Sequence, residues 1–251
     1  MPYPILTPMQ EDLTLKSLCA LTIMAKAPRP GRVKTRLSPP LTPEEAAAIN
    51  TCFLEDTTKN IGEVAELGGS VGVISYTPVG DEHLFEGLFP EGYRLIAQRG
   101  DGFGERLLTT AQDLFAHGFG SVCLIDSDSP TVPRKAFAMA VDALEHDGDR
   151  IVLGPSHDGG YYLIGMKQAH YEIFKDITWS TSTVFDETVS AVRSIGVELI
   201  TLPMWYDVDD AETLALLRRE LVDGLTPEFT SLSGYPAERT RSFLKRLDDS
   251  A

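Results

Sequence analysis

The segment of residues 26–37 concentrates positive charge in a chain that is otherwise acidic. It carries five of the 22 lysines and arginines, at Lys26, Arg29, Arg32, Lys34 and Arg36, whereas the whole chain has a net charge of −15 at pH 7. Prolines and a glycine between these cations favour an ordered turn over a helix. Exposed amides with lysine and arginine donors suit the binding of a di- or triphosphate. The Walker motif is absent, so the segment is not a P-loop, and a solvated basic loop remains the alternative.

A pair of aspartates comes directly after the apolar run of residues 121–125. Asp126 and Asp128 are two positions apart, and carboxylates at this spacing can share a hard cation with phosphate oxygens. An Asx turn before a helix explains the same two residues without any metal. Both interpretations remain open at this point.

A second acidic run covers residues 207–210. We expect Asp209 to cap the helix that follows, with Glu212 as its partner in a capping box. Asp207 has no evident structural role, so it is the better candidate for a second metal ligand. A solvated loop carboxylate is the alternative for Asp207.

Residues 154–162 form a loop rich in glycine, with Asp158, Gly159 and Gly160 in succession. Glycines permit a ligand to approach the backbone closely, and the neighbouring aspartate could contact that ligand. A tight hairpin turn explains the same residues, because Asp-Gly is a strong hairpin signal.

Another glycine-rich loop, residues 98–106, precedes an expected helix. Gly100, Gly102 and Gly104 have the spacing G-x-G-x-G, which differs from the dinucleotide fingerprint G-x-G-x-x-G and excludes a Rossmann cofactor site. We expect a flexible loop that lines a nucleotide pocket.

These loops alternate with segments that have the periodicity of strands and helices. The expected strands cover residues 19–25, 70–76, 93–97, 121–125, 151–153, 161–166 and 197–202. The first expected helix begins at Pro43, after Thr42 as its cap. The other expected helices cover residues 103–117, 133–146, 182–195, 210–222 and 236–247. The alternation favours a mostly parallel sheet covered by helices. In such sheets ligands bind outside the carboxyl ends of the strands, where the charged and glycine-rich loops fall.

Length and charge restrict the organisation and the partners. A chain of 251 residues favours one large α/β domain, here residues 1–251 with a core at about 19–224 and a C-terminal appendage at 225–251. The acidic charge disfavours binding to nucleic acid and to an anionic membrane surface.

Cysteine usage and the apolar runs bear on the compartment. The three cysteines are widely spaced, which argues against a disulfide framework and a thiolate zinc site and favours free thiols in a reducing cytoplasm. Residues 18–25 are too short to span a bilayer, and the first fifteen residues lack the basic start of a signal peptide. We therefore expect a cytoplasmic protein with no membrane span.

Four ordered motifs together resemble a known family. They are AKAPRPGRVKTRL (25–37), IDSDSPTVP (125–133), LGPSHDGGYYLIG (153–165) and YDVDDAETL (206–214). The chain resembles, over about residues 21–217, the bacterial GT-A-type nucleotide-diphospho-sugar-transferase-like proteins, a former domain of unknown function often described as glycosyltransferases. Relatives of that family include the molybdenum-cofactor and 2-phospholactate guanylyltransferases. The segment AERTRSFL (237–244) is also similar to the family.

The resemblance implies a three-layer α/β/α GT-A-like fold with a mixed, mainly parallel sheet, and it assigns roles to the loops. The nucleotide and its phosphates would be bound by the cationic loop and by the second glycine-rich loop, at Lys26, Arg29, Gly31, Lys34, Arg36, Gly102 and Gly104. The divalent cation would be bound by Asp128 with Asp207 or Asp209, and the acceptor by Asp158, Gly159, Gly160 and Tyr161. Glycine is common in the family where this chain has Asp126, so Asp126 is either a metal ligand or a residue behind the ligands.

The activity implied is that of a transferase that uses a nucleotide-activated donor, an unidentified small-molecule acceptor and Mg²⁺ or Mn²⁺. Asp128 would bind the cation, and Lys34 and Arg36 would neutralise the charge that grows on the leaving group. Glycosyl transfer from a nucleotide-diphospho-sugar is the first expectation. Nucleotidyl transfer with release of pyrophosphate is the alternative, and a non-catalytic nucleotide-binding protein is a third reading. The sequence leaves the oligomeric state open.

Overall fold

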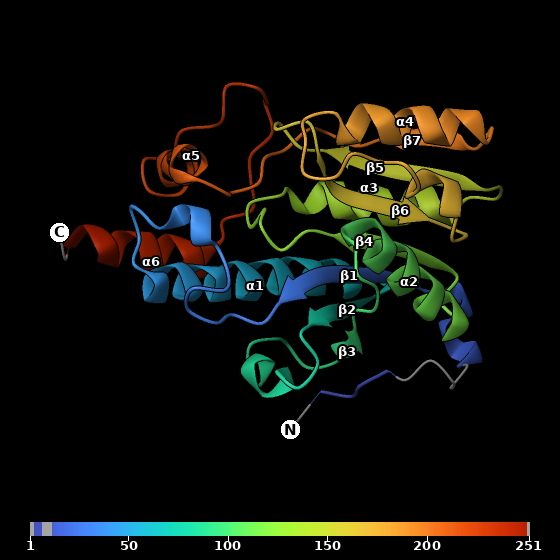
Figure 1. The fold of residues 1–251 in the computed structure, drawn as a ribbon, viewed down its shortest axis with the longest axis horizontal. Helices are drawn as coiled ribbons and strands as arrows, with labels where there is room; N and C mark the ends of the chain where they lie inside the picture. Colours follow the sequence, from blue (N-terminus) through green and yellow to red (C-terminus); the bar gives the residue numbers. More distant parts are fainter. Residues whose placement is uncertain (1–2, 7–11, 250–251) are drawn as a thin grey trace.

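A single mixed sheet of seven strands forms the centre of the protein (Figure 1). The structure is a computed structural model that describes residues 3–6 and 12–249. The strands are β1 (Cys19–Lys26), β2 (Ser70–Thr77), β3 (Arg94–Ala97), β4 (Ser121–Ile125), β5 (Arg150–Pro155), β6 (Tyr161–Met166) and β7 (Glu198–Thr201), in the order β3-β2-β1-β4-β6-β5-β7. β6 runs antiparallel to β4 and β5, and the other neighbouring pairs are parallel. The predicted mixed, mainly parallel sheet is confirmed.

Helices cover both faces of the sheet. They are α1 (Pro43–Ala65), α2 (Phe103–Ala116), α3 (Arg134–Glu145), α4 (Val184–Ser194), α5 (Ala211–Leu221) and α6 (Glu238–Asp249), with short 3₁₀ helices η1 (Leu13–Ser17), η2 (Thr35–Leu37), η3 (Glu82–Phe85) and η4 (Tyr171–Ile173). Side chains alternate between the two faces of each strand. In β1, Leu21 and Ile23 join one apolar cluster with α1 and α3, whereas Ala20 joins a second cluster with α2 and α4. The predicted three-layer arrangement is confirmed.

The long helix α1 begins where its residues predict. The Thr42 side chain accepts from the Glu45 amide, and the Glu45 side chain accepts from the Thr42 amide, which completes a capping box with Pro43 in the first turn. This arrangement satisfies backbone donors that the helix itself cannot pair. The predicted start of this helix is therefore confirmed.

The carboxyl edge of the sheet gathers the loops on which the functional prediction depends. β1, β3, β4 and β5 end at this edge because they run in the same direction. β6 runs the opposite way, so its first residue, Tyr161, lies at the same edge. The cationic segment, residues 26–37, follows β1, and the glycine-rich loop of residues 98–106 follows β3. The pair Asp126 and Asp128 follows β4, and the glycine-rich loop of residues 154–162 follows β5.

The C-terminal segment packs along α1. Tyr235, Phe243 and Leu244 belong to the same buried cluster as the α1 face of the sheet. The buried carboxylate of Asp56 on α1 accepts hydrogen bonds from the backbone amide of Arg239, at 3.1 Å, and from that of Thr240, at 2.8 Å. A side chain of α1 thus caps the first turn of α6. This helix begins at Glu238, two residues after the start expected from the sequence.

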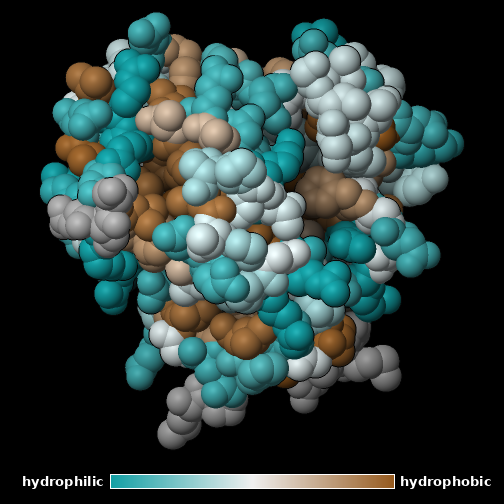
Figure 2. All heavy atoms as spheres, turned by 60° about the vertical axis from the view of Figure 1, so that its left-hand side comes forward, coloured by the Kyte–Doolittle hydropathy of each residue, from teal (hydrophilic) through white to brown (hydrophobic). Residues whose placement is uncertain are grey.

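The side of the molecule that bears α5 and α6 is partly apolar. Figure 2, which turns this side forward, shows apolar residues lying between hydrophilic ones. A cavity of about 370 Å³ there is lined by α5, α6 and residues 40–41. Across the part of the chain that the structure describes, no helix combines the length and apolarity needed to cross a bilayer.

Substitution of Asp56 by alanine tests the attachment of α6. Removing the acceptor of two α6 amides should lower the free energy of unfolding by about 1–2 kcal/mol, the usual cost of losing a helix cap. Urea unfolding measures this change. Glu238→Ala, an exposed residue at the same helix end, is the control and should change stability by less than about 0.5 kcal/mol. Equal stability of Asp56→Ala and the wild type would contradict this account.

Candidate active site

After β7 the chain turns back and crosses the carboxyl edge of the sheet. We define residues 202–210 as the crossing segment. Its backbone bonds first to β5, through the Trp205 amide and the Pro155 carbonyl at 3.0 Å. It then bonds to the loop after β4, through the Val208 amide and the Asp128 carbonyl at 2.9 Å. The crossing segment therefore carries its aspartates from one side of the sheet to the loops that follow β4 and β1.

Lys34 lies where these three parts of the chain meet. Its ammonium is 2.7 Å from the Asp128 carboxylate and 3.1 Å from the Asp209 carboxylate, and it donates to the Val208 carbonyl at 2.7 Å. Its side chain is only 4% exposed and lies over the Phe53 ring, 5.5 Å from the ring centre. One ammonium thus joins the cationic loop to the first aspartate pair and to the crossing segment.

The surroundings of Lys34 keep it charged. Burial by itself would lower the pKa of Lys34, but the Asp128 and Asp209 carboxylates outweigh burial and raise that pKa above its ordinary value. A buried ammonium is stable when carboxylates and a carbonyl satisfy its donors. Lys34 is therefore a fixed positive charge inside the site.

The prediction that Asp209 caps the helix after the crossing segment is wrong. The cap of α5 is Asp210, whose carboxylate accepts from the Thr213 amide at 2.9 Å, and Thr213 rather than Glu212 completes the capping box. The helix starts one residue later than expected, which leaves the Asp209 carboxylate to pair with Lys34 and Arg36. Asp209 is thus part of the charged site.

Asp126 makes bonds within its own loop. Its carboxylate accepts from the Ser129 hydroxyl at 2.7 Å and from the Asp128 amide at 3.4 Å, the pattern of the Asx turn that was the alternative interpretation. Burial, and next the charge of Asp128, raise the pKa of Asp126 well above its ordinary value. Both carboxylate oxygens of Asp126 are thus engaged within its own loop.

Asp207 lies beside the first glycine-rich loop. Its carboxylate accepts from the Ser156 hydroxyl at 2.8 Å. Burial, followed by the charges of Asp158 and Asp209, raises the pKa of Asp207 to about 6. This carboxylate therefore links the glycine-rich loop of residues 154–162 to the crossing segment.

The acidic side chains exceed the buried positive charge. Asp128 and Asp209 contact the one buried cation, Lys34, whose charge also acts on Asp126, and Asp207 lies near Asp209. Within residues 3–6 and 12–249, no three His, Cys, Asp or Glu side chains are grouped closely enough to hold a metal ion by themselves. Magnesium sites commonly use one or two carboxylates and complete the shell with water and substrate phosphates. The oxygen donors and the excess negative charge fit a divalent cation shared in this way.

A cavity of about 270 Å³ opens beside Lys34, and we call it the cationic pocket. Its lining is mostly basic and polar, with two carboxylates; it consists of Lys26, Arg32, Val33, Lys34, Thr35, Arg36, Asn50, Ser127, Asp128 and Asp209. The cavity therefore combines cations for phosphate oxygens with carboxylates for a divalent ion.

Some of the predicted phosphate-binding residues lie elsewhere. Arg29 pairs with Asp81, beyond β2, and it does not line the cationic pocket. Gly31 lies in the exposed turn of the same loop with a φ of +69°. Gly102 is the cap residue of α2, and Gly104 packs so closely on Trp179 that a Cβ there would be 2.6 Å from the indole nitrogen. Gly104 therefore has a packing role whatever ligand lies near, whereas a Cβ at Gly102 would meet open space.

The predicted acceptor residues do not line the cationic pocket, and of these residues Asp158 lies near enough to Asp207 for its charge to raise the Asp207 pKa. The Asp158 carboxylate accepts from the Gly160 amide at 2.8 Å, and Tyr161 lies against Trp179 with ring centres 6.4 Å apart. Gly159 has a φ of +93°, and a Cβ at this position would be 2.1 Å from the Ser182 carbonyl oxygen. The loop thus depends on glycine at this position for its shape.

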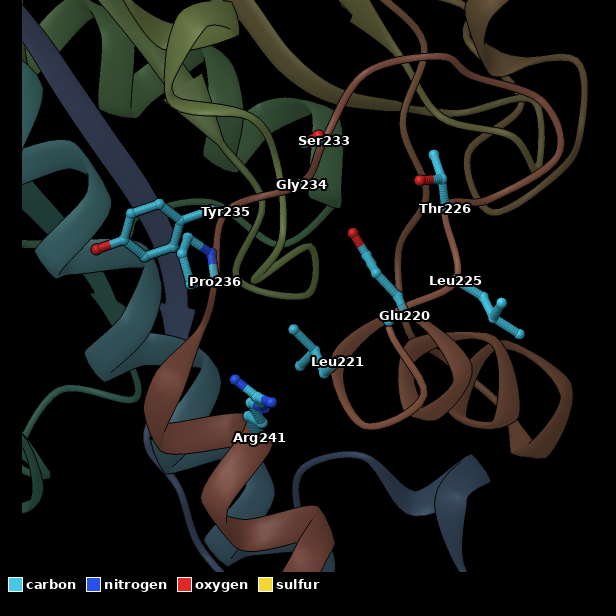
Figure 3. A pocket seen from close by; sticks show the side chains of 10 residues that line it. Glu220, Leu221, Leu225, Thr226, Ser233, Gly234, Tyr235, Pro236 and Arg241 are labelled. Atoms are coloured by element: carbon cyan, nitrogen blue, oxygen red, sulfur yellow. The ribbon is translucent and has the colours of Figure 1, made fainter.

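Hydrogen bonds from Trp205 and Tyr206 hold the crossing segment against the rest of the protein. The Tyr206 hydroxyl donates to the Glu220 carboxylate, and the Trp205 indole donates to the Thr131 hydroxyl at 3.0 Å. Figure 3 shows Glu220 pointing from α5 toward Ser233 and Gly234 across a cavity of about 260 Å³. None of the charged residues of the cationic pocket lines this second cavity.

Sequence reasoning missed Asn50 and the Val208 carbonyl. Asn50 is a polar residue between the apolar positions Ile49 and Phe53 on the buried face of α1, which is a signal in the sequence itself. The Val208 carbonyl leaves no such signal, because a backbone acceptor depends only on the path of the chain.

This chain is similar to a protein family and to a solved structure. Residues 60–181 match the family described as "Uncharacterized protein conserved in bacteria (DUF2064)". The crystal structure of a candidate nucleotide-diphospho-sugar transferase from Desulfovibrio desulfuricans G20 is 29% identical, with a TM-score of 0.75, and the match covers 91% of this chain and 97% of that one. The predicted family resemblance is confirmed.

Two further proteins are similar to this chain, the first in sequence and the second in fold. The 2-phospho-L-lactate guanylyltransferase of Methanothermobacter thermautotrophicus is 26% identical over 185 residues, 72% of this chain and 76% of the relative. A nucleotidyl transferase structure from Methanothermobacter, 14% identical with a TM-score of 0.54 over 83% of this chain and 99% of that one, shows the same fold. The prediction of an enzyme of the transferase class is confirmed, and the coarser functional prediction, a transferase that uses a nucleotide, is supported.

The corrected cap predicts different results for two adjacent aspartates. Asp210→Ala should lower the free energy of unfolding by about 1 kcal/mol and expose the Thr213 amide to hydrogen exchange. Asp209→Ala should leave the Thr213 amide protected, because the cap remains. Amide hydrogen exchange with mass spectrometry distinguishes the two. Loss of protection in Asp209→Ala but not in Asp210→Ala would restore the original assignment.

The close contact at Gly159 gives a second prediction. Gly159→Ala should lower the free energy of unfolding by at least about 3 kcal/mol, because it adds a backbone clash to an unfavourable φ. Gly196→Ala is the matched control, since Gly196 has a φ of +70° with open space around it, and its cost should be about 1–2 kcal/mol. Urea unfolding of both variants measures the difference, and equal costs would refute the predicted clash.

Proposed function

We propose that the chain transfers a group from a nucleotide-activated donor to a small-molecule acceptor, with Mg²⁺ or Mn²⁺ as cofactor. One observation carries the proposal: the buried Lys34 ammonium contacts both Asp128 and Asp209 inside a pocket also lined by Lys26, Arg32 and Arg36. Cations grouped at a pocket suit polyphosphate, and carboxylates beside them suit a divalent ion that bridges phosphate oxygens.

The chemistry assigned to these residues is electrostatic. In this proposal Asp128, with Asp209 or Asp207, holds the divalent cation, which supplies charge neutralisation at the phosphate oxygens. Lys34 and Arg36 stabilise the negative charge that develops on the leaving phosphate. Preorganised charges in a site shielded from water act strongly because they need not reorganise during the reaction.

The acceptor is assigned to the loop beside Asp207. Asp158, Gly159, Gly160 and Tyr161 would line its site, and the Ser156–Asp207 hydrogen bond holds this loop against the crossing segment. A carboxylate near the acceptor can take a proton from an attacking hydroxyl. In this proposal the acceptor lies on one side of the aspartates and the donor phosphates lie on the other.

Glycosyl transfer from a nucleotide-diphospho-sugar is our first proposal for the reaction. The similarity to the Desulfovibrio protein, 29% identical over 91% of this chain, supports it. In this reaction the bond between the anomeric carbon and the diphosphate oxygen breaks, and the carbon forms a bond to the acceptor oxygen. The nucleoside diphosphate is the leaving group.

Nucleotidyl transfer is the second candidate. The similarity to the guanylyltransferase, at 26% identity over 72% of the chain, favours it. In this reaction an acceptor oxygen attacks the α-phosphorus of a nucleoside triphosphate, and pyrophosphate leaves. Both reactions place growing negative charge on a phosphate that Lys34 and Arg36 can neutralise.

Product analysis decides between the two reactions. The protein is incubated with Mg²⁺ or Mn²⁺, a panel of nucleotide-sugars and nucleoside triphosphates, and a mixture of hydroxyl and phosphate acceptors. Release of a nucleoside diphosphate from a nucleotide-sugar supports glycosyl transfer, whereas release of pyrophosphate from a triphosphate supports nucleotidyl transfer. Nucleotide binding without turnover of any donor would favour a binding protein instead.

Asp128→Asn should separate catalysis from folding. We expect turnover to fall by about 10²-fold or more, the usual loss when a charge-stabilising group is removed, whereas the protein stays folded because Asp209 and the Val208 carbonyl still bind Lys34. The control is Asp142→Asn on the exposed face of α3, which should keep full turnover. A folded and fully active Asp128→Asn protein would contradict the proposal.

A further inference from the structure

Asn50 is a buried polar residue whose side chain makes no hydrogen bond to any residue that the structure describes. It lies on α1, is 4% exposed and belongs to the lining of the cationic pocket. Its Oδ1 is covered and has no hydrogen-bond partner, and within the described residues its amide nitrogen makes no hydrogen bond either. Buried polar groups are normally hydrogen-bonded, and each exception requires an explanation.

Asn60 on the same helix shows what a structural asparagine looks like in this protein. It is 1% exposed, and its amide nitrogen donates to the Val132 carbonyl at 2.8 Å. Asn60 therefore joins α1 to the segment before α3. The Oδ1 atoms of both asparagines are buried without a partner, so the two residues differ at the amide nitrogen. Among the described residues the Asn50 amide nitrogen has no acceptor, so packing of α1 gives no reason for an amide at this position.

The position of Asn50 indicates what its amide can bind. Because Oδ1 is the covered atom, the amide nitrogen is the end that meets the cavity. Lys34, whose side chain is 4% exposed, lines the same pocket, as do the exposed cations Arg32 and Arg36. A neutral N–H donor among cations suits an anionic oxygen that accepts several hydrogen bonds.

We propose that Asn50 binds a phosphoryl oxygen of the nucleotide donor through its amide nitrogen. This inference rests on the proposed function and identifies a residue that the charged motifs do not include. Lys34 already shares its charge between Asp128 and Asp209. Asn50 adds a donor to the phosphate site without adding charge, and a bound phosphoryl oxygen would accept from the amide nitrogen, which bonds to no other described residue.

The test compares Asn50→Leu with Asn60→Leu. Calorimetric titration with inorganic pyrophosphate and with GDP, each with Mg²⁺, measures affinity, and thermal denaturation measures stability. For Asn50→Leu we expect affinity to fall by about tenfold or more, since a hydrogen bond to a charged group is lost, with a melting temperature equal to or above that of the wild type. For Asn60→Leu we expect unchanged affinity and a lower melting temperature.

The combination of affinity and stability makes each result decisive. Unchanged affinity of Asn50→Leu overturns the inference. A fall in both affinity and melting temperature, similar to the destabilisation of Asn60→Leu, also overturns it, because Asn50 would then be structural. If the wild-type protein binds neither pyrophosphate nor GDP, the proposed function fails and the inference fails with it. If the wild type binds and Asn50→Leu binds equally well, only the role of Asn50 is refuted.

Discussion

The ammonium of Lys34 is the interaction on which the site depends. It contacts the loop after β4 through Asp128 and the crossing segment through Val208 and Asp209. These segments are far apart in the chain, and each carries carboxylates that would repel one another without a cation between them. Because the Lys34 side chain is almost completely buried, water screens this attraction little. Lys34 thus lets several acidic groups lie together at one edge of the sheet.

The fold places this charge where it can act. Parallel strands deliver their loops to one edge, and the crossing segment returns from β7 over β5 and β4 to reach Lys34. The aromatic residues Trp205 and Tyr206 hold that segment from behind through Thr131 and Glu220. Burial and hydrogen bonding outside the charged site therefore add to the attraction of Lys34 in keeping the aspartates close.

Much of the fold and part of the site could be predicted from the sequence. Strand and helix periodicity located the elements within a few residues, because apolar alternation follows directly from which face is buried. Convergence of Lys34 and Asp128 followed from the rule that loops meet at the carboxyl ends of parallel strands. These predictions need only local patterns and topology.

Three details could not be obtained in that way. The cap of α5 moved from Asp209 to Asp210, because either aspartate has the right chemistry and only the path of the crossing segment chooses between them. Arg29 pairs with Asp81, a partner that depends on how the loops after β1 and β2 fold against each other. Asn50 is visible in the sequence as a polar residue on an apolar face, but its meaning depends on finding its amide without a partner.

The most direct measurement is a crystal structure of the protein with Mn²⁺ and GDP or UDP. The account predicts diphosphate oxygens within hydrogen-bond distance of Lys34 and Arg36, with an anomalous manganese peak that contacts the Asp128 carboxylate. A diphosphate bound in another cavity, such as the one beside Glu220 and Gly234, with Lys34 still bonded to both aspartates and no manganese near them, would contradict it.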